Sequence, residues 1–256
     1  GSDVHTLWDG GRTVLSAAAE NSNPEIMSIL LEAGVDVNAR SDGGGTPLMD
    51  AVIAFHANTD KVTSVLLKSG ADVNAKDDRG NTALISAQIR NSGGQILTKM
   101  LLEAGADVNA KNNEGMTALM TAVSFQIRNT TIPHLIEAGA DVNARDALGH
   151  SALIHATEDC AYRGTVRTLL EAGADVNMQD DAGRTALMNV AMGCGKIDVI
   201  TLLLNAGANA DLKSKEGMTA LEYAVEHAGK DKKEDESPDS RKNTELIEML
   251  QAATGN

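Results

Sequence analysis

The chain has 256 residues, with 36 acidic and 22 basic side chains and a formal net charge of −14. This charge repels the phosphate backbone, and the one Trp, two Tyr and two Phe offer little base stacking, so no nucleic-acid partner is expected. Two cysteines exclude a disulfide scaffold, and no apolar run approaches the roughly 20 residues that span a bilayer, so membrane insertion is not expected either.

Two short motifs recur along the chain at nearly constant spacing. The glycine of an Ala-Gly-Ala-Asp-Val-Asn-like segment stands at Gly34, Gly70, Gly105, Gly139, Gly173 and Gly207. The hydroxyl residue of a Gly-x-Thr/Ser-x-Leu segment stands at Thr13, Thr46, Thr82, Thr117, Ser151, Thr185 and Thr219. Each glycine precedes the next hydroxyl residue by 12 positions, whereas 21 to 24 positions lead from the hydroxyl residue to the next glycine. The constant interval predicts a tight hairpin that stacks in register, and the variable interval contains a surface turn between two helices.

The first elements in chain order are a cap and a series of similar units. We expect residues 1–12 to form an N-terminal cap in which Val4, Leu7 and Trp8 cover the first unit, because an end unit lacks a neighbour. Residues 13–228 are expected to hold repeats of about 34 residues. In each repeat the hydroxyl residue caps a first helix, paired leucines mark a second helix, and the Ala-Gly glycine ends that helix with a positive φ.

Some repeats depart from this pattern. Extra residues between the two helices are expected around 55–60 and 90–94. In the fourth repeat Pro133 predicts a shortened second helix with the proline in its first turn. His134 then falls where other repeats bury an apolar residue, so it is either a partly buried histidine with a hydrogen-bond partner or a pH-sensing residue.

The end of the chain contains a charged segment and a last helix. Residues 229–242 carry five basic and five acidic side chains, which predicts a mobile, solvated insertion with a regulatory role left open. Residues 243–256 are expected to form a C-terminal capping helix that begins near Thr244. One domain is expected over residues 1–256.

These motifs resemble the ankyrin repeat. The resemblance rests on Gly45-Thr46-Pro47-Leu48, on Gly183-Arg184-Thr185-Ala186-Leu187 and on the six Ala-Gly segments, and it covers about residues 10 to 228. It implies an all-α ankyrin-repeat solenoid of stacked antiparallel helix pairs with short hairpin tips. The histidine that commonly follows the motif leucine in the family is replaced, by Met49 and Ile85 for example, as is typical of divergent, often bacterial, members.

The family resemblance implies a non-catalytic module that binds a folded protein on its concave face, through hairpin tips and first-helix ends. Carried onto this chain, the candidate protein-binding residues are Ile53, Asp78, Arg79, Asn81, Asn113, Glu114, Met116, Phe125, Leu148, His150, Glu158, Asp159, Asp181, Arg184 and Met192. An inhibitor or immunity-type protein that blocks an enzyme's active site would use the same surface, and an enzyme or metal-dependent protein is the distant alternative. We expect a monomer when free; the compartment is not predicted beyond a cytoplasmic default, or a periplasmic or secreted one if a signal peptide was removed.

The residues offer no catalytic set, cofactor site or metal site. Cys160 and Cys194 occupy equivalent places in adjacent repeats and are expected to be free thiols. His150 and His155 are five positions apart, a poor spacing for two ligands on one helical face, and no carboxylate is expected to complete a cluster. A stripe of basic residues at one repeat position either meets an acidic partner or is neutralised by the Asp or Asn of the next turn; it consists of Arg40, Lys76, Lys111 and Arg145, continued by Gln179 and Lys213.

Overall fold

The computed structural model describes residues 11–54, 57–89, 94–125, 130–158, 162–193, 196–230 and 238–254. These residues form helices joined by turns and loops, and no strand occurs among them. The chain divides into two compact units, Gly1–Ala140 and Asp141–Asn256. The boundary falls between two consecutive repeats, and the expected single domain over 1–256 stays a prediction. The N-terminal cap expected from Val4, Leu7 and Trp8 lies outside the described residues.

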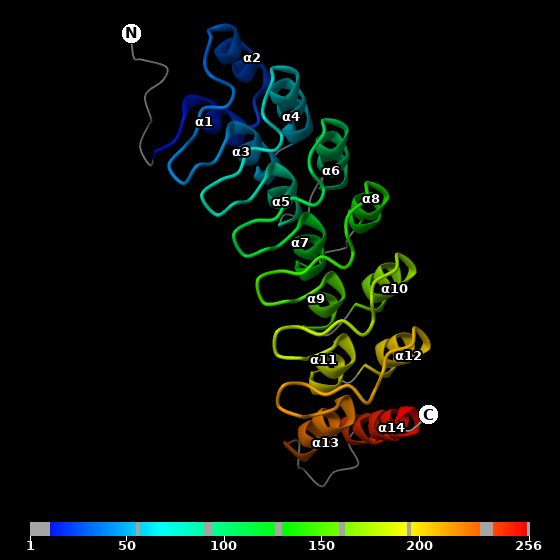
Figure 1. Cartoon of the computed structure of the whole chain (residues 1–256). Helices are drawn as coiled ribbons and strands as arrows, with labels where there is room; N and C mark the ends of the chain where they lie inside the picture. Colours follow the sequence, from blue (N-terminus) through cyan, green and yellow to red (C-terminus); the bar gives the residue numbers. More distant parts are fainter. Residues whose placement is uncertain are drawn as a thin grey trace. The chain divides into compact units, whose positions relative to one another are not determined.

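The first unit consists of helix pairs in two rows (Figure 1). First helices α1, α3, α5 and α7 pack on one another, and second helices α2, α4, α6 and α8 form the other row. Their bounds are α1 Val14–Glu20, α2 Pro24–Glu32, α3 Pro47–Ile53, α4 Thr59–Lys68, α5 Ala83–Gln88, α6 Gly94–Glu103, α7 Ala118–Ser124 and α8 Ile132–Glu137.

The second unit repeats this arrangement. Helices α9, α11 and α13 pack in one row, and α10, α12 and α14 in the other. Their bounds are α9 Ala152–Glu158, α10 Arg163–Glu171, α11 Ala186–Met192, α12 Ile197–Asn205, α13 Ala220–Lys230 and α14 Pro238–Ala253. The described helices confirm the expected all-α fold of stacked helix pairs.

The first helices begin where the hydroxyl residues predict. Thr46, Thr82, Thr117 and Thr185 have extended backbones, and each side chain accepts a hydrogen bond from the backbone N–H three residues later. This bond satisfies one of the helix N–H groups that has no partner within the helix. At α13 the arrangement is reciprocal, because Glu222 Oε2 accepts from the Thr219 N–H at 2.6 Å, and the hydrogen bonds from Thr219 lower the pKa of Glu222.

The second helices end at the Ala-Gly glycine, as expected. Gly105 has φ +88° and Gly173 has the same value, a left-handed conformation that glycine adopts without steric cost. The N–H of Gly173 donates to the Leu170 carbonyl at 3.0 Å, which closes the last turn of α10.

The core of each unit lies between the two rows of helices. The motif leucine is buried in the repeats of both units, as Leu84 and Leu153 illustrate, and so is a leucine of the second helix such as Leu101. Burial of one such side chain contributes about 1.5–3 kcal/mol. Small buried residues on the first helices, including Ala87 and Ala156, let neighbouring repeats approach closely.

Two local predictions have different outcomes. Helix α8 is short and begins at Ile132 with Pro133 in its first turn, which confirms the shortened second helix. Helix α14 begins at Pro238, six residues before Thr244, so part of the segment 229–242 is helical and the predicted start was wrong. High charge predicts contact with solvent but does not prevent a helix, and Pro238 is tolerated as the first helical residue. Residues 231–237 lie outside the described residues, so a mobile insertion there stays a prediction.

Candidate protein-binding surface

The loops before α5, α7, α9 and α11 are each organised by one polar residue. In the first unit, Asp77 Oδ1 accepts hydrogen bonds from the backbone N–H groups of Arg79 at 2.9 Å and Asn81 at 2.7 Å. The same pair of bonds recurs at Asn112, Asp146 and Asp180. These bonds hold the backbone of each tip in one conformation, and they are made by a residue within the loop itself.

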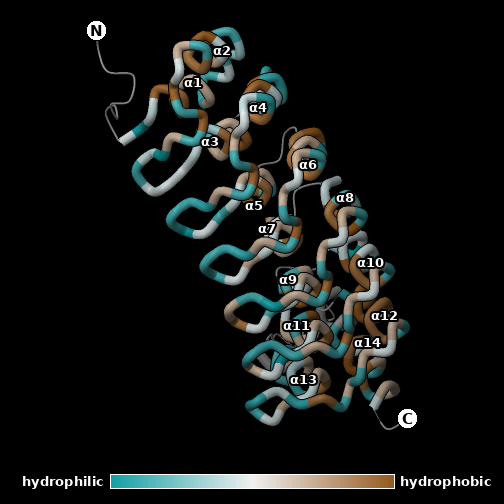
Figure 2. The backbone as a smooth tube through the Cα atoms, turned by 45° about the horizontal axis from the view of Figure 1, so that its top comes forward, coloured by the Kyte–Doolittle hydropathy of each residue, from teal (hydrophilic) through white to brown (hydrophobic). Residues whose placement is uncertain are grey.

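Neighbouring tips within a unit are joined through their main chains. The N–H of Asn113 donates to the Arg79 carbonyl at 2.9 Å, and the N–H of Asp181 donates to the Leu148 carbonyl at 3.0 Å. Figure 2 shows that these loops are mostly hydrophilic, whereas the helices carry both hydrophilic and hydrophobic residues.

The stripe of basic residues has a structural role. Arg40 Nη2 donates to the Lys76 carbonyl at 2.5 Å, and Lys76 Nζ donates to the Lys111 carbonyl at 2.7 Å. In the second unit Gln179 Nε2 makes the equivalent bond to the next repeat. Arg145 pairs with a carboxylate of the following repeat, since its Nη2 lies 3.2 Å from Asp181 Oδ1.

The asparagine of the Asp-Val-Asn segment joins adjacent repeats. Asn177 Nδ2 donates to the Gly207 carbonyl at 3.1 Å, and Asn177 Oδ1 accepts from the Asn209 N–H at 2.7 Å. Asn74 and Asn143 make the same two bonds. Sequence reasoning placed this segment in a tight hairpin and missed the link between repeats. The recurrence of asparagine at one position was the available signal.

The predicted binding residues of the first unit lie on the tips and on the ends of the first helices. Phe125, at the end of α7, is 45% exposed. Asp78, Arg79, Asn113 and Glu114 lie on the tips, whereas Ile53, Asn81 and Met116 are partly buried. All four of these tip residues are exposed.

The second unit places most of its predicted residues in the same way. Leu148 is 62% exposed on a tip, and Met192 is 36% exposed at the end of α11. Glu158 and Asp181 are exposed, and Arg184 is partly buried beside Asp180. Asp159, together with Cys160 and Cys194, lies outside the described residues.

His150 differs from the other candidates because it is only 8% exposed. Its ring lies between Glu158, whose Oε1 is 3.2 Å from Nδ1, and Asp180, whose Oδ2 is 3.5 Å from Nε2. The assignment of His150 to an exposed contact surface was therefore wrong, because carboxylates of its own and the next repeat draw the side chain inward.

The expectation that no carboxylate joins the two histidines was also wrong. One ligand atom from each of Asp146, His150 and His155 lies within 4.8 Å of the others. The helical-spacing argument failed because His150 precedes α9 and belongs to the loop, so the two residues do not share one helix.

The electrostatics of this cluster favour the protonated form of His155. Burial alone lowers the pKa of His155, but the hydrogen bonds and charges of Glu158 and Asp146 outweigh it, and the pKa is raised. The hydrogen bond from His155 lowers the pKa of Glu158 more than partial burial raises it.

His134 is a partly buried histidine with a partner. Its Nε2 lies 2.7 Å from Gln95 Nε2, and its Nδ1 lies 3.6 Å from Glu137 Oε2. This arrangement agrees with the structural interpretation of His134 in the sequence.

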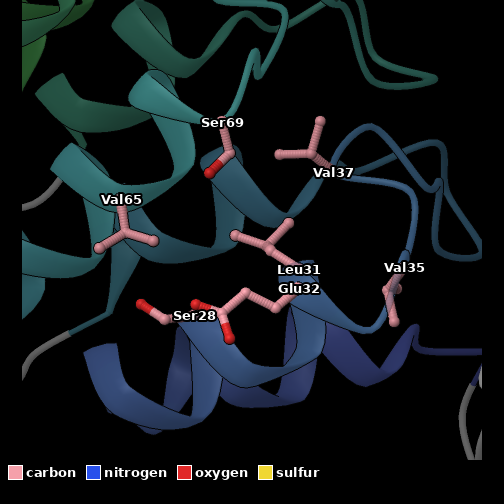
Figure 3. Close-up of a pocket in the computed structure, with 7 residues that line it drawn as sticks. All are labelled: Ser28, Leu31, Glu32, Val35, Val37, Val65 and Ser69. Carbon is pink, nitrogen blue, oxygen red and sulfur yellow. The ribbon is translucent and has the colours of Figure 1, made fainter.

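A cavity of about 380 Å³ lies between α2 and α4 of the first unit (Figure 3). Glu32 is the only ionisable residue among the described residues of its lining, so the cavity lacks a pair of groups for acid–base chemistry. The lining consists of Ser28, Leu31, Glu32, Val35, Val37, Val65 and Ser69. Elsewhere, none of the described helices has both the length and the apolar character needed to cross a membrane.

Comparisons with known proteins agree with the repeat architecture. A family model described as ankyrin repeats (3 copies) matches residues 1–77, 53–146, 84–180 and 153–233. The ankyrin repeat domain of human ASB11 superposes with a TM-score of 0.73 at 24% identity, covering 92% of this chain and 98% of that one. The ankyrin repeat domain of Bcl-3 gives a TM-score of 0.73 at 29% identity, covering 95% of this chain and all of that one (100%).

A curated relative matches over a shorter stretch. The mouse ankyrin repeat and MYND domain-containing protein 1 is 48% identical over 46 residues, which is 18% of this chain and only 5% of the mouse protein. The family model, by contrast, matches most of the sequence, and the observed caps, glycines and helix pairs agree with it. The chain therefore belongs to the ankyrin-repeat family.

Proposed function

We propose that the chain is a non-catalytic module that binds a folded protein through its loop tips and the exposed ends of its first helices. Ankyrin repeats are in general protein–protein interaction modules. In this chain the proposal rests on one observation: exposed side chains, the apolar Leu148 and the guanidinium of Arg79, a type enriched at interfaces, stand on tips whose backbone is held by hydrogen bonds.

The fixed backbone supports binding because little conformational entropy is lost when a preorganised surface meets its partner. The N–H groups of Leu148 and His150 both donate to Asp146, so Leu148 is presented in one loop conformation. Met192 adds a second apolar side chain in the same unit.

The test compares two surfaces of equal apolar character. The full chain is used to capture proteins from its source cells, and the affinity of a purified captured protein is then measured by calorimetry. We expect the Leu148→Ser/Met192→Ser variant to bind at least about tenfold more weakly, since each anchor contributes on the order of 1 kcal/mol or more.

The control is Ile29→Ser/Ile96→Ser, which removes exposed side chains of the second helices α2 and α6. If the Leu148→Ser/Met192→Ser variant binds the partner as tightly as the parent chain, this surface is not the binding face. A larger loss of affinity in the control variant would lead to the same conclusion. Activity of a captured enzyme with and without the chain distinguishes an inhibitor from a scaffold.

A further inference from the structure

Two histidines and three carboxylates of the second unit converge between a loop tip and α9. The ring centroids of His150 and His155 are 5.2 Å apart, with the ring planes at 81°. Both imidazole side chains are 10% exposed, and the carboxylates of Asp146 and Asp180 are 6% and 1% exposed. Glu158, which is more exposed, completes the group.

All four imidazole nitrogens face carboxylate oxygens. For His155, Nε2 lies 2.9 Å from Asp146 Oδ2, and Nδ1 lies 3.1 Å from Glu158 Oε2. For His150, Nδ1 lies 3.2 Å from Glu158 and Nε2 lies 3.5 Å from Asp180. A neutral imidazole has one N–H donor and one lone pair, so it satisfies only one of two such acceptors. The cluster therefore requires additional positive charge, from protons or from a metal ion.

The charge of the cluster suits a divalent ion. The carboxylates of Asp146, Glu158 and Asp180 supply three negative charges, and Arg184, whose Nε is 3.0 Å from Asp180 Oδ2, supplies one positive charge. With neutral histidines, two negative charges remain. Buried charges of one sign are costly unless they are paired or bind a cation.

Three of these groups are spaced as ligands of one ion. Asp146 Oδ2 is 2.9 Å from His155 Nε2 and 3.7 Å from His150 Nδ1, and one ligand atom of each residue lies within 4.8 Å of the others. Tetrahedral zinc with bonds of about 2.0–2.1 Å places its ligand atoms about 3.3 Å apart, so small side-chain movements suffice. Glu158 Oε1 lies 3.2 Å from His150 Nδ1 but does not belong to this three-residue group.

The remaining nitrogens have the partners that metal-binding histidines use. When Nε2 of His155 binds an ion, Nδ1–H donates to Glu158; when Nδ1 of His150 binds, Nε2–H donates to Asp180. Asp146 Oδ1 is held by the N–H groups of Leu148 and His150, which leaves Oδ2 for the ion. Carboxylates in these positions fix the tautomer and the orientation of the rings.

We propose that Asp146, His150 and His155 form a binding site for a divalent transition-metal ion of the zinc class, with Glu158 and Asp180 as the carboxylates that orient the two rings. Imidazole and carboxylate ligands suit such ions. The equivalent positions in other repeats hold different residues, since Asn81 and Arg184 correspond to His150, and Thr121 and Asn189 to His155. The site is thus specific to one repeat.

The test measures Zn²⁺ binding to the metal-free full chain by calorimetry at pH 7.5, in a Cys160→Ser/Cys194→Ser background that removes thiol ligands. We expect one Zn²⁺ per chain and a visible absorption band of four-coordinate Co²⁺ when cobalt replaces zinc. The His150→Asn/His155→Asn variant, which uses side chains that other repeats carry, should lose at least about 100-fold in affinity. Asp180→Asn should lose about 10- to 100-fold, as expected for a carboxylate that orients a ligand.

The control is His227→Asn, which removes a histidine of α13 and should leave zinc binding unchanged; circular dichroism checks that every variant is folded. Absence of zinc binding by the parent chain would show that protons alone satisfy the cluster and would overturn the proposal. The proposal would also be overturned if the His150→Asn/His155→Asn variant bound zinc as tightly as the parent chain. Because metal binding is measured without a protein partner, either result leaves the proposed protein-binding function untouched.

Discussion

Asp50 lies on α3, and its carboxylate is partly buried. Its Oδ2 atom has no hydrogen-bond partner among the described residues. Burial raises the pKa of Asp50, and the charge of Glu20 adds to this effect, while the hydrogen bond with Ser16 and the charge of Arg12 oppose it. The ionised form is therefore less favourable in the folded chain than in the unfolded chain.

The raised pKa predicts that Asp50→Asn stabilises the folded chain to an extent that depends on pH. A raised folded-state pKa contributes stability below the unfolded value, near 3.8, and that contribution is lost as the pH rises through the folded pKa. At pH 7 the variant should be more stable than the parent by about 1 kcal/mol, because the unpaired charge is gone. Urea unfolding at pH 7 and at acidic pH measures the difference, which should shrink as the pH falls.

Glu114→Gln is the matched control, since it neutralises an exposed carboxylate on a tip of the same unit. It should change stability little at either pH. A destabilised Asp50→Asn variant at pH 7 would mean that the carboxylate contributes more than its burial costs.

At the scale of single elements, the length of each helix depends on signals at its two ends. A capping hydroxyl group begins the first helix, and a left-handed glycine ends the second. These signals are local in sequence, which is why the order of the helices could be predicted from the sequence. The start of α14 could not, because residues 238–243 carry no apolar pattern that separates a charged helix from a charged loop.

Helix α10 offers a matched pair of glycines for a test at this scale. Gly173, beyond its C-terminus, has φ +88° and open space where a Cβ atom would stand, so Gly173→Ala adds backbone strain without a clash. Gly164, inside the helix, would make only ordinary contacts of 3.5–3.6 Å with Tyr162 through an added Cβ. We expect Gly173→Ala to destabilise by about 1 kcal/mol and Gly164→Ala to stabilise by about 0.5–1 kcal/mol.

The melting temperatures of the two variants, measured in parallel, check this prediction. Effects of the same sign in both would contradict it, because the same change in side chain would then act independently of backbone conformation.

At the scale of the whole molecule, adjacent repeats are linked by polar contacts as well as by buried leucines. Asn74 in the first unit and Asn177 in the second each bridge to a repeat about 30 residues away. The period predicts that such repeats are neighbours, but it does not say which side chains join them. Sequence reasoning missed the contacts of His150 with His155 and Asp180 for a related reason. These contacts depend on the geometry of the loop and on a residue of the following repeat.

The asparagine link predicts a measurable loss of stability in Asn177→Ala. The change removes two hydrogen bonds across a repeat boundary, and we expect a cost of about 1–2 kcal/mol, because solvent partly replaces bonds in an exposed loop. Urea unfolding at neutral pH measures the effect.

Asn205→Ala is the control, since it truncates an exposed asparagine at the end of α12. Its effect should stay within about 0.5 kcal/mol. If both variants lost the same free energy of unfolding, the two hydrogen bonds of Asn177 would contribute no more than ordinary surface contacts.

The residue that precedes the capping hydroxyl in four repeats shows how this loop accommodates different side chains. At this place Asn81, Met116, His150 and Arg184 all use the same backbone N–H to bond the polar residue four positions earlier. An amide, a thioether, an imidazole and a guanidinium are thus interchangeable there as far as the loop is concerned. A change of side chain at this place keeps the backbone N–H that organises the loop, so we expect a library of substitutions there to retain the loop conformation.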